Sequence, residues 1–195
     1  MPLVFREPEL PTGFPDVVAV FCGERSARPP AARWRLGRDH LRLLHHLYTV
    51  RRASASELAD ALGWSSSRSL QVVLDDLENA LLVRQHEGRV SARALASVFI
   101  ARGIVAVEAK IHDWQQALRQ AIANTWFASQ SYILMPSARL KPAAFDHAAR
   151  FGIGVMTYNG QRTKVELGAR RHRIPASYGS WLVNEWAVRH TARSR

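Results

Sequence analysis

Two charged side chains stand in an otherwise apolar stretch, residues 103–111, which reads GIVAVEAKI. Most of its apolar residues are of the β-branched type that fills a buried strand. Because the side chains of a strand alternate between its two faces, Glu108 and Lys110 point the same way. Burying unpaired charge is costly, so we expect this pair to be exposed to a ligand that needs both charges. A divalent metal ion together with a phosphate group is such a ligand.

Another acid stands at the start of a second apolar stretch, residues 15–21, which reads PDVVAVF. A turn at residues 11–13 separates it from an earlier predicted strand, residues 3–9, which carries Glu7 and Glu9 on one face. Taken alone, Asp16 is explained as a residue at a strand entry. Glu108 and Lys110 alone are explained as an ion pair at the edge of a sheet.

The charge of the whole chain is the first indication of a partner. Its 195 residues carry a formal net charge of +11, which favours nucleic acid, although a need for solubility or the Arg-rich codon usage of a GC-rich genome explains it too. No apolar run reaches the length of a membrane span, and the N-terminus lacks a signal pattern. Cys22 is the only cysteine, so no internal disulfide can form. We therefore expect a cytoplasmic protein without a membrane partner.

The middle of the chain has the signals of three helices followed by a hairpin. A basic linker is predicted over residues 24–37, and the helices over residues 39–52, 56–62 and 66–82. A capping box, SASE at residues 54–57, opens the second helix, and Gly63 ends it. Short strands flank the two-residue turn of Glu87 and Gly88. This order of elements resembles a winged helix-turn-helix domain over residues 38–95.

The winged-helix resemblance implies a set of DNA contacts, because the third helix of such domains enters the major groove by its N-terminal half. The side chains placed there are Ser66, Ser67, Arg68 and Gln71. Arg84 and Arg89 would add positive charge on or beside the wing. Three acids further along the third helix, Asp75, Asp76 and Glu78, keep a second interpretation open, in which the domain docks on protein.

The last half of the chain alternates strands and helices. After the strand with Glu108 we expect a helix over residues 112–128, a strand over 131–136, a helix over 142–151 and strands over 152–158 and 163–167. A last helix carries Trp181 and Trp186, which with Trp114 and Trp126 are expected in the core. Three tail residues, Arg170, Arg171 and Arg173, contact phosphates or belong to a solvated loop. The expected fold class is α+β, with an α/β-type core of a mixed central sheet flanked by helices.

A strand with Pro15 and Asp16, a strand with Glu108 and Lys110, then helix, strand, helix and strand resembles the PD-(D/E)XK nuclease superfamily. The resemblance covers residues 1–23 and 98–167. It implies a discontinuous nuclease domain, residues 1–23 and 98–195, into which the winged-helix domain is inserted. It also implies that the strand of Asp16 pairs with the strand of Glu108. The chain departs from the superfamily by lacking a helix before the first strand, whose acid Glu7 or Glu9 would have to replace.

The resemblance further implies a reaction, the hydrolysis of phosphodiester bonds in double-stranded DNA. Asp16, Glu108 and the Ala109 carbonyl would hold Mg²⁺ or Mn²⁺, and Lys110 would orient the attacking water. Gln120 on the following helix would assist, with Gln116 as the alternative. Two other functions stay open: a non-catalytic DNA-binding protein or regulator that uses the nuclease-like fold as a scaffold, and an interaction module. A second copy of the chain or another protein is open as a further partner.

Overall fold

The computed structural model describes residues 1–11, 13–23 and 29–193. It divides the chain into two compact units, and each unit is made from two separate stretches of sequence. The first unit holds Met1–Gly23 and Ala101–Ser180, and the second holds Glu24–Ile100 and Trp181–Arg195. Residues 98–100 and 181–195, which we placed in the nuclease-like domain, thus fall into the second unit.

Six strands form one sheet in the described part of the first unit, in the spatial order β1-β2-β6-β7-β8-β9. The strands are β1 (Leu3–Arg6), β2 (Val17–Cys22), β6 (Ala101–Ala109), β7 (Gln130–Pro136), β8 (Gly154–Tyr158) and β9 (Thr163–Leu167). The pairs β6–β7 and β7–β8 are parallel and the others antiparallel. The predicted mixed sheet is confirmed, and the chain is α+β.

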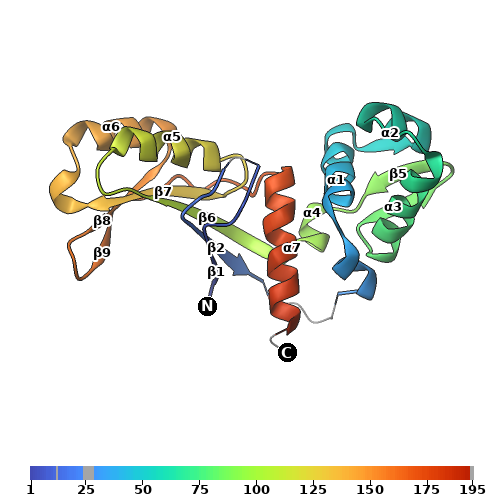
Figure 1. The fold of residues 1–195 in the computed structure, drawn as a ribbon, viewed down its shortest axis with the longest axis horizontal. Coiled ribbons are helices and arrows are strands. Elements are labelled where there is room, and N and C mark those ends of the chain that lie inside the picture. Colours follow the sequence, from blue (N-terminus) through green and yellow to red (C-terminus); the bar gives the residue numbers. More distant parts are fainter. Residues whose placement is uncertain (12, 24–28, 194–195) are drawn as a thin grey trace. The chain divides into compact units, whose positions relative to one another are not determined.

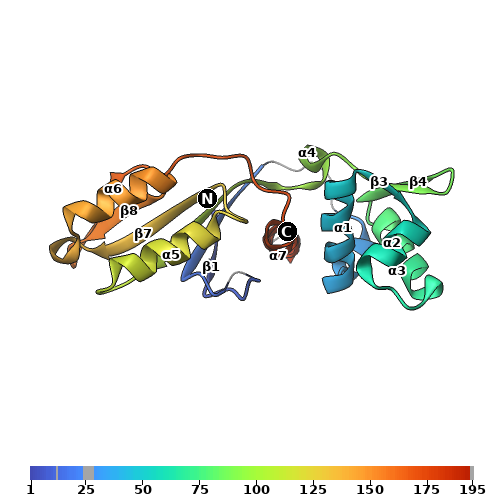
Figure 2. The same ribbon diagram turned by 90° about the horizontal axis from the view of Figure 1, so that it is seen from above.

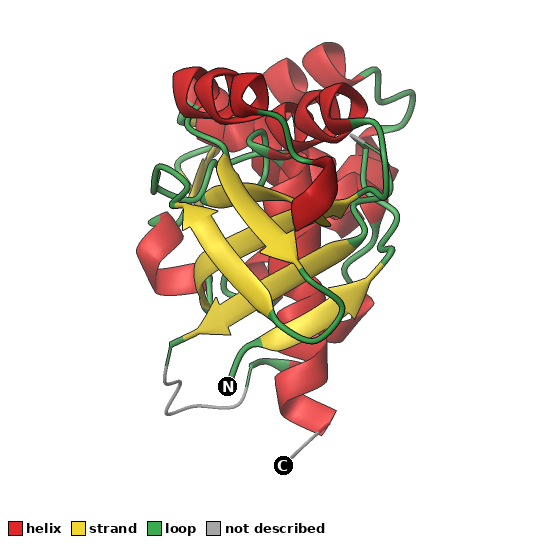
Figure 3. Cartoon of the chain, turned by 90° about the vertical axis from the view of Figure 1, so that its left-hand side faces the viewer, coloured by secondary structure: helices red, strands yellow, loops and turns green. Residues whose placement is uncertain are grey.

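Two helices connect the parallel strands, α5 (Trp114–Asn124) between β6 and β7, and α6 (Pro142–Phe151) between β7 and β8. A 3-10 turn, η2 (Ser137–Arg139), precedes α6. Both helices lie on the same face of the sheet, as Figures 1 and 2 show. In Figure 3 they form a layer above the yellow strands. Alanines on the buried side of both helices let them approach the sheet closely, and Ala117 and Ala148 pack with Ile133 and Val155.

The register between β2 and β6 positions the predicted acids. Val17 pairs with Val107 and Val18 with Ala106 in an antiparallel ladder. Asp16 immediately precedes β2, so the next opposed position along the ladder is that of Glu108. Two strands that are remote in sequence are therefore neighbours in the sheet, as the resemblance to the nuclease superfamily requires.

The described part of the second unit combines helices with a three-stranded sheet of order β3-β5-β4. Its elements up to residue 92 are η1 (Ala31–Arg35), α1 (Arg38–Val50), β3 (Arg52–Ser54), α2 (Ala55–Leu62), α3 (Ser67–Asn79), β4 (Val83–His86) and β5 (Arg89–Ala92). The predicted capping box is confirmed, because Ser54 Oγ accepts from Glu57 N at 3.2 Å and Glu57 Oε2 accepts from Ser54 N at 2.6 Å. Gly63 ends α2 in the left-handed conformation, with φ 68°.

The turn between β4 and β5 has the geometry that a two-residue hairpin needs. Glu87 and Gly88 both have positive φ, 50° and 69°. Such a pair matches the twist of the flanking strands, so the predicted hairpin is confirmed. The short strand β3, which the sequence analysis missed, pairs with β5 and extends this hairpin into a sheet.

The remaining elements of the second unit are α4 (Leu95–Val98) and α7 (Tyr178–Arg193), whose residues from Trp181 onward belong here. Part of the predicted basic linker, residues 24–28, lies outside the described residues, but residues 31–35 form the helix η1. Arg33 in this helix is buried and bonded to Glu185 of α7 through two hydrogen bonds of 3.0 and 2.7 Å. In the described part of the chain, no helix combines the length and apolar character needed to cross a membrane.

Candidate active site

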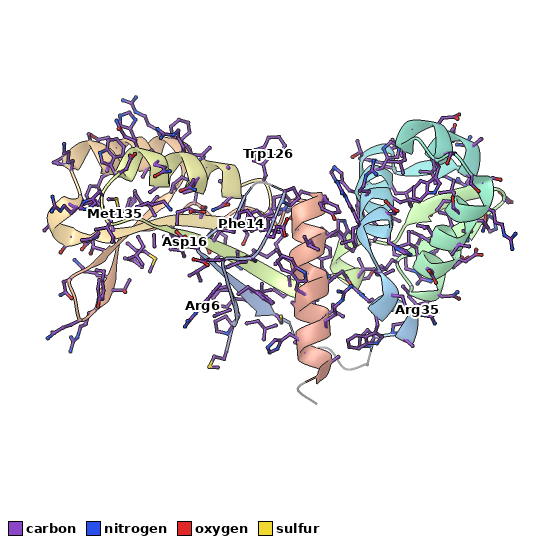
Figure 4. The ribbon with its side chains drawn as sticks, viewed as in Figure 1. Arg6, Phe14, Asp16, Arg35, Trp126 and Met135 are labelled. Carbon is purple, nitrogen blue, oxygen red and sulfur yellow. The ribbon has the colours of Figure 1, made fainter. Side chains whose placement is uncertain are left out.

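Asp16 lies against the end of β6. Its Oδ2 accepts a hydrogen bond from the backbone N of Ala109 at 2.7 Å. Its own backbone carbonyl accepts from Glu7 N at 3.0 Å, which continues the β1–β2 ladder by one step. These contacts hold the carboxylate at the start of β2, where Figure 4 labels it. A residue at a strand entry that merely faced solvent would not be tied to a second strand in this way.

Lys110 follows directly after β6 and reaches the same carboxylate. Its Nζ is 3.6 Å from Asp16 Oδ2, and both side chains are about three-quarters buried, with 26% and 29% of their surfaces exposed. Its backbone N donates to Leu134 O at 3.0 Å, so the neighbouring strand β7 fixes the main chain here. The ammonium group is thus held beside the site but keeps access to solvent.

Glu108 is buried, with 2% of its surface exposed, which corrects the expectation that both charged side chains of this strand are exposed to a ligand. Its Oε1 accepts from Asn124 Nδ2 of α5 at 2.6 Å. Its Oε2 is also buried but has no hydrogen-bond partner among the described residues. A buried carboxylate oxygen without a donor is unfavourable, so this atom marks a position where a proton or a cation would be stabilised.

The pKa of Glu108 reflects this environment. Burial raises it above the usual carboxyl value, while the hydrogen bond from Asn124 lowers it. The nearby Asp16 raises the pKa further by its negative charge, and Lys110 opposes this effect. Two facing carboxylates have only acceptors to offer each other. They are compatible when one is protonated or when a cation lies between them.

Helix α5 contributes a residue that the sequence analysis did not name. Asn124 makes the contact with Glu108, whereas the predicted residue Gln120 has its Oε1 buried and without a partner in the described part of the chain. The two lie one helical turn apart, so both face the sheet. The alternative, Gln116, is exposed in the first turn, where its backbone N is capped by Asp113. The spacing of Gln120 and Asn124 was the signal that would have revealed Asn124.

The residues present fit a divalent cation of the Mg²⁺ type. The carboxylates of Asp16 and Glu108 lie side by side at the end of β6, and oxygen ligands are what such an ion prefers. The predicted third acids, Glu7 and Glu9, are exposed, and within residues 1–11, 13–23 and 29–193 no three His, Cys, Asp or Glu side chains are grouped so as to hold a metal. Asp16 and Glu108 are thus the two acids that the site offers to a cation among the described residues.

The predicted DNA-contacting residues of the second unit lie at the surface. Ser66 caps α3 by accepting from Ser69 N at 3.4 Å, and Ser67 and Arg68 are exposed in its first turn. Gln71 is engaged within the protein, since its Nε2 donates to Asp75 Oδ1 at 2.7 Å. In this structure Arg68 is thus more accessible to a base or phosphate than Gln71.

The other predicted arginines differ in their surroundings. Arg84 is exposed on β4, whereas Arg89 on β5 forms an ion pair with Glu57 at 3.1 Å. The side chains of Arg170, Arg171 and Arg173 are exposed in the coil after β9 of the first unit. The backbone of this coil is fixed, because Arg170 N donates to Gly152 O at 2.9 Å.

The tryptophans are only partly core residues. Trp181 is completely buried, but Trp126, expected in the core, is 71% exposed in the turn after α5. Figure 4 shows its ring standing clear of the ribbon. Trp126 lies just past the helix, so the helical spacing that placed it on the apolar face of α5 no longer applies.

Comparisons of the chain with protein families, with curated proteins and with solved structures find no match.

Proposed function

We propose that this protein is a metal-dependent DNA endonuclease that grips DNA through its winged-helix-like unit. The observation that carries the proposal is the meeting of Asp16, Glu108 and Lys110 from two remote segments, with hydrogen-bonded or ionic contacts of 2.7 and 3.6 Å from Asp16 to the end of β6. A surface ion pair would explain Lys110 and Asp16 but not a buried acid with an unpartnered oxygen beside them.

Each side chain of the proposed active site would have a separate role in the reaction. Asp16 and Glu108, with the Ala109 carbonyl, would hold Mg²⁺ or Mn²⁺, which supplies charge neutralisation and lowers the pKa of bound water. Asn124 orients Glu108, and the accessible ammonium of Lys110 stabilises negative charge on a phosphate and orients the attacking water. Gln120, one turn from Asn124, offers a buried acceptor that can orient the same water.

The expected substrate class follows from charge. A net charge of +11 attracts a polyanion, and the exposed arginines include three in the coil after β9 and one in the first turn of α3. The order of elements in the second unit supports binding of duplex DNA, with α3 in the major groove. Phosphate contacts would provide the affinity, and Arg68 is the candidate for base contacts.

Cleavage of plasmid DNA in Mg²⁺ or Mn²⁺ tests the proposal. Replacing Lys110 by alanine is expected to lower the rate by about 10²- to 10³-fold, because a charge that acts in the transition state is lost. Lys164→Ala is the matched control, since Lys164 pairs with Glu166 at 2.8 Å on β9, away from the site. The rate should be unchanged in this variant. Cleavage that continues in EDTA, or that falls equally in both variants, would rule the proposal out.

A second candidate function, DNA binding without cleavage, is supported by the exposed first turn of α3. Arg68→Ala is expected to weaken binding of a preferred sequence by about tenfold and to reduce the preference itself. Arg42→Ala on α1 removes the same charge from an exposed arginine that pairs weakly with Asp39 at 3.9 Å. Titrations at two salt concentrations compare the variants. An equal loss in both would mean that α3 contributes only general positive charge.

A further inference from the structure

A small cavity opens beside Lys110, where the parallel strands of the first unit end. Its volume is about 190 Å³. Residues from the ends of three neighbouring strands and the turn after β6 line it, among them Lys110, Ile111, Leu134, Met135, Pro136 and Tyr158. Met135, labelled in Figure 4, marks the end of β7 at this position. Lys110 therefore borders the cavity and also pairs with Asp16 of the candidate active site.

The chemistry of the cavity suits a flat aromatic group. Its walls are aliphatic and aromatic, and Lys110 is the charged residue among the described residues that line it. The hydroxyl of Tyr158 donates to Gly160 O at 2.6 Å, which fixes the ring while 45% of the side chain remains exposed. A ring held in this way can stack on a ligand without losing much conformational freedom.

The size of the cavity limits the ligand. Pockets for drug-sized ligands enclose about 300–1,000 Å³, so this cavity suits a single ring system. A phosphate held between Lys110 and the acids would place its attached nucleoside within reach of the cavity. The net charge of +11 also favours an anionic chain over an apolar peptide as the source of that ring.

We propose that this cavity receives one unpaired nucleobase of the DNA next to the scissile phosphate, stacked on Tyr158. In an intact duplex each base is stacked and paired, so extracting it costs the free energy of both interactions. The preferred substrate would therefore contain an unpaired nucleotide, as in a single strand, a flap or a mismatch. This inference rests on the proposed nuclease function, because that function places the phosphate at Lys110.

Fluorescence of 2-aminopurine tests the inference without requiring cleavage. Oligonucleotides carrying this base in an unpaired position are mixed with the full chain in EDTA, and the intact duplex carrying the same base serves for comparison. We expect quenching with the unpaired base and not with the duplex. Tyr158→Ala should abolish the quenching and lower the affinity for the unpaired substrate by about tenfold. Tyr158→Phe, which keeps the ring, should retain both.

Phe151→Ala is the control for loss of an exposed aromatic ring, since Phe151 lies at the end of α6, outside the cavity, and is 56% exposed. Equal binding and quenching by wild type and Tyr158→Ala would overturn the inference, as would equal quenching with the intact duplex. If the cavity instead holds a side chain of a protein partner, wild type and Tyr158→Ala will bind and quench equally. Quenching that depends on Tyr158 in a protein that cleaves no DNA would instead contradict the proposed function while keeping the base-binding cavity.

Discussion

Replacing Glu108 by glutamine is expected to reduce DNA cleavage by at least about 10²-fold and, at the same time, to make the fold more stable at pH 8. The substitution removes a charge that would bind the cation. The side-chain oxygen of the glutamine can still accept the hydrogen bond that Asn124 donates to Glu108 at 2.6 Å. The amide nitrogen of the glutamine can donate to the facing Asp16, which a second carboxylate cannot do.

The sign of the stability change follows from the pKa of Glu108. Burial is the main cause that raises it above the usual carboxyl value. A raised pKa in the folded state means that the protonated form is favoured, and this stabilisation is lost as the pH rises through the folded pKa. At pH 8 the wild-type protein therefore carries a penalty that the glutamine variant lacks. The difference in stability between the two proteins should narrow as the pH falls towards the usual carboxyl pKa.

Urea unfolding at pH 5 and pH 8 measures this difference, with Glu166→Gln as the control of opposite sign. Hydrogen bonds from Lys164 and then Thr157 lower the pKa of Glu166. Its ionised form therefore stabilises the fold at pH values above the usual carboxyl pKa, and this stabilisation is lost as the pH falls through the folded-state pKa. Glu166→Gln should therefore be slightly destabilising at pH 8 and leave cleavage unchanged. A Glu108→Gln variant that cleaves normally would show that this acid has no catalytic role. A variant that loses stability at pH 8 would show that the ionised carboxylate is not a penalty to the fold.

The site could be predicted from sequence only as far as strand alternation and element order reach. Alternation placed Glu108 and Lys110 on one side, and the order of strands suggested that Asp16 would be their neighbour. Sequence could not show that Glu108 is buried, because burial depends on how α5 crosses the sheet. For the same reason Asn124 was missed, although it lies one helical turn from the predicted Gln120.

The fold could be predicted where local signals were strong. The capping box at Ser54 and the turn at Glu87 and Gly88 located their helix and strands closely, because both depend on neighbouring residues. Residues 31–35 and the last helix were assigned incompletely because their roles depend on a contact 152 residues apart, between Arg33 and Glu185. Composition alone does not distinguish an exposed linker rich in arginine and proline from a segment whose arginine is buried in an ion pair.

Arg33→Ala is expected to destabilise the second unit by about 3–5 kcal/mol, since it leaves the buried Glu185 without its cationic partner. Arg33 and Glu185 are 2% and 1% exposed, and the guanidinium also donates to Val98 O at 2.8 Å. Arg33 therefore joins three separate segments, the helix η1, the end of α4 and α7. Removing the guanidinium would leave two acceptors without this donor, the Glu185 carboxylate on α7 and Val98 O at the end of α4.

Arg35→Ala is the matched control, because Arg35 lies two residues along the same short helix and is exposed, as Figure 4 shows. Its loss should change the free energy of unfolding by less than about 0.5 kcal/mol. Arg33→Met combined with Glu185→Leu removes both charges and should recover much of the stability, because buried ion pairs can be replaced by apolar side chains of similar size. Urea unfolding followed by circular dichroism compares the three variants. Equal effects of Arg33→Ala and Arg35→Ala would mean that the ion pair does not hold α7 in the second unit, and that residues 24–37 act as the linker their composition suggests.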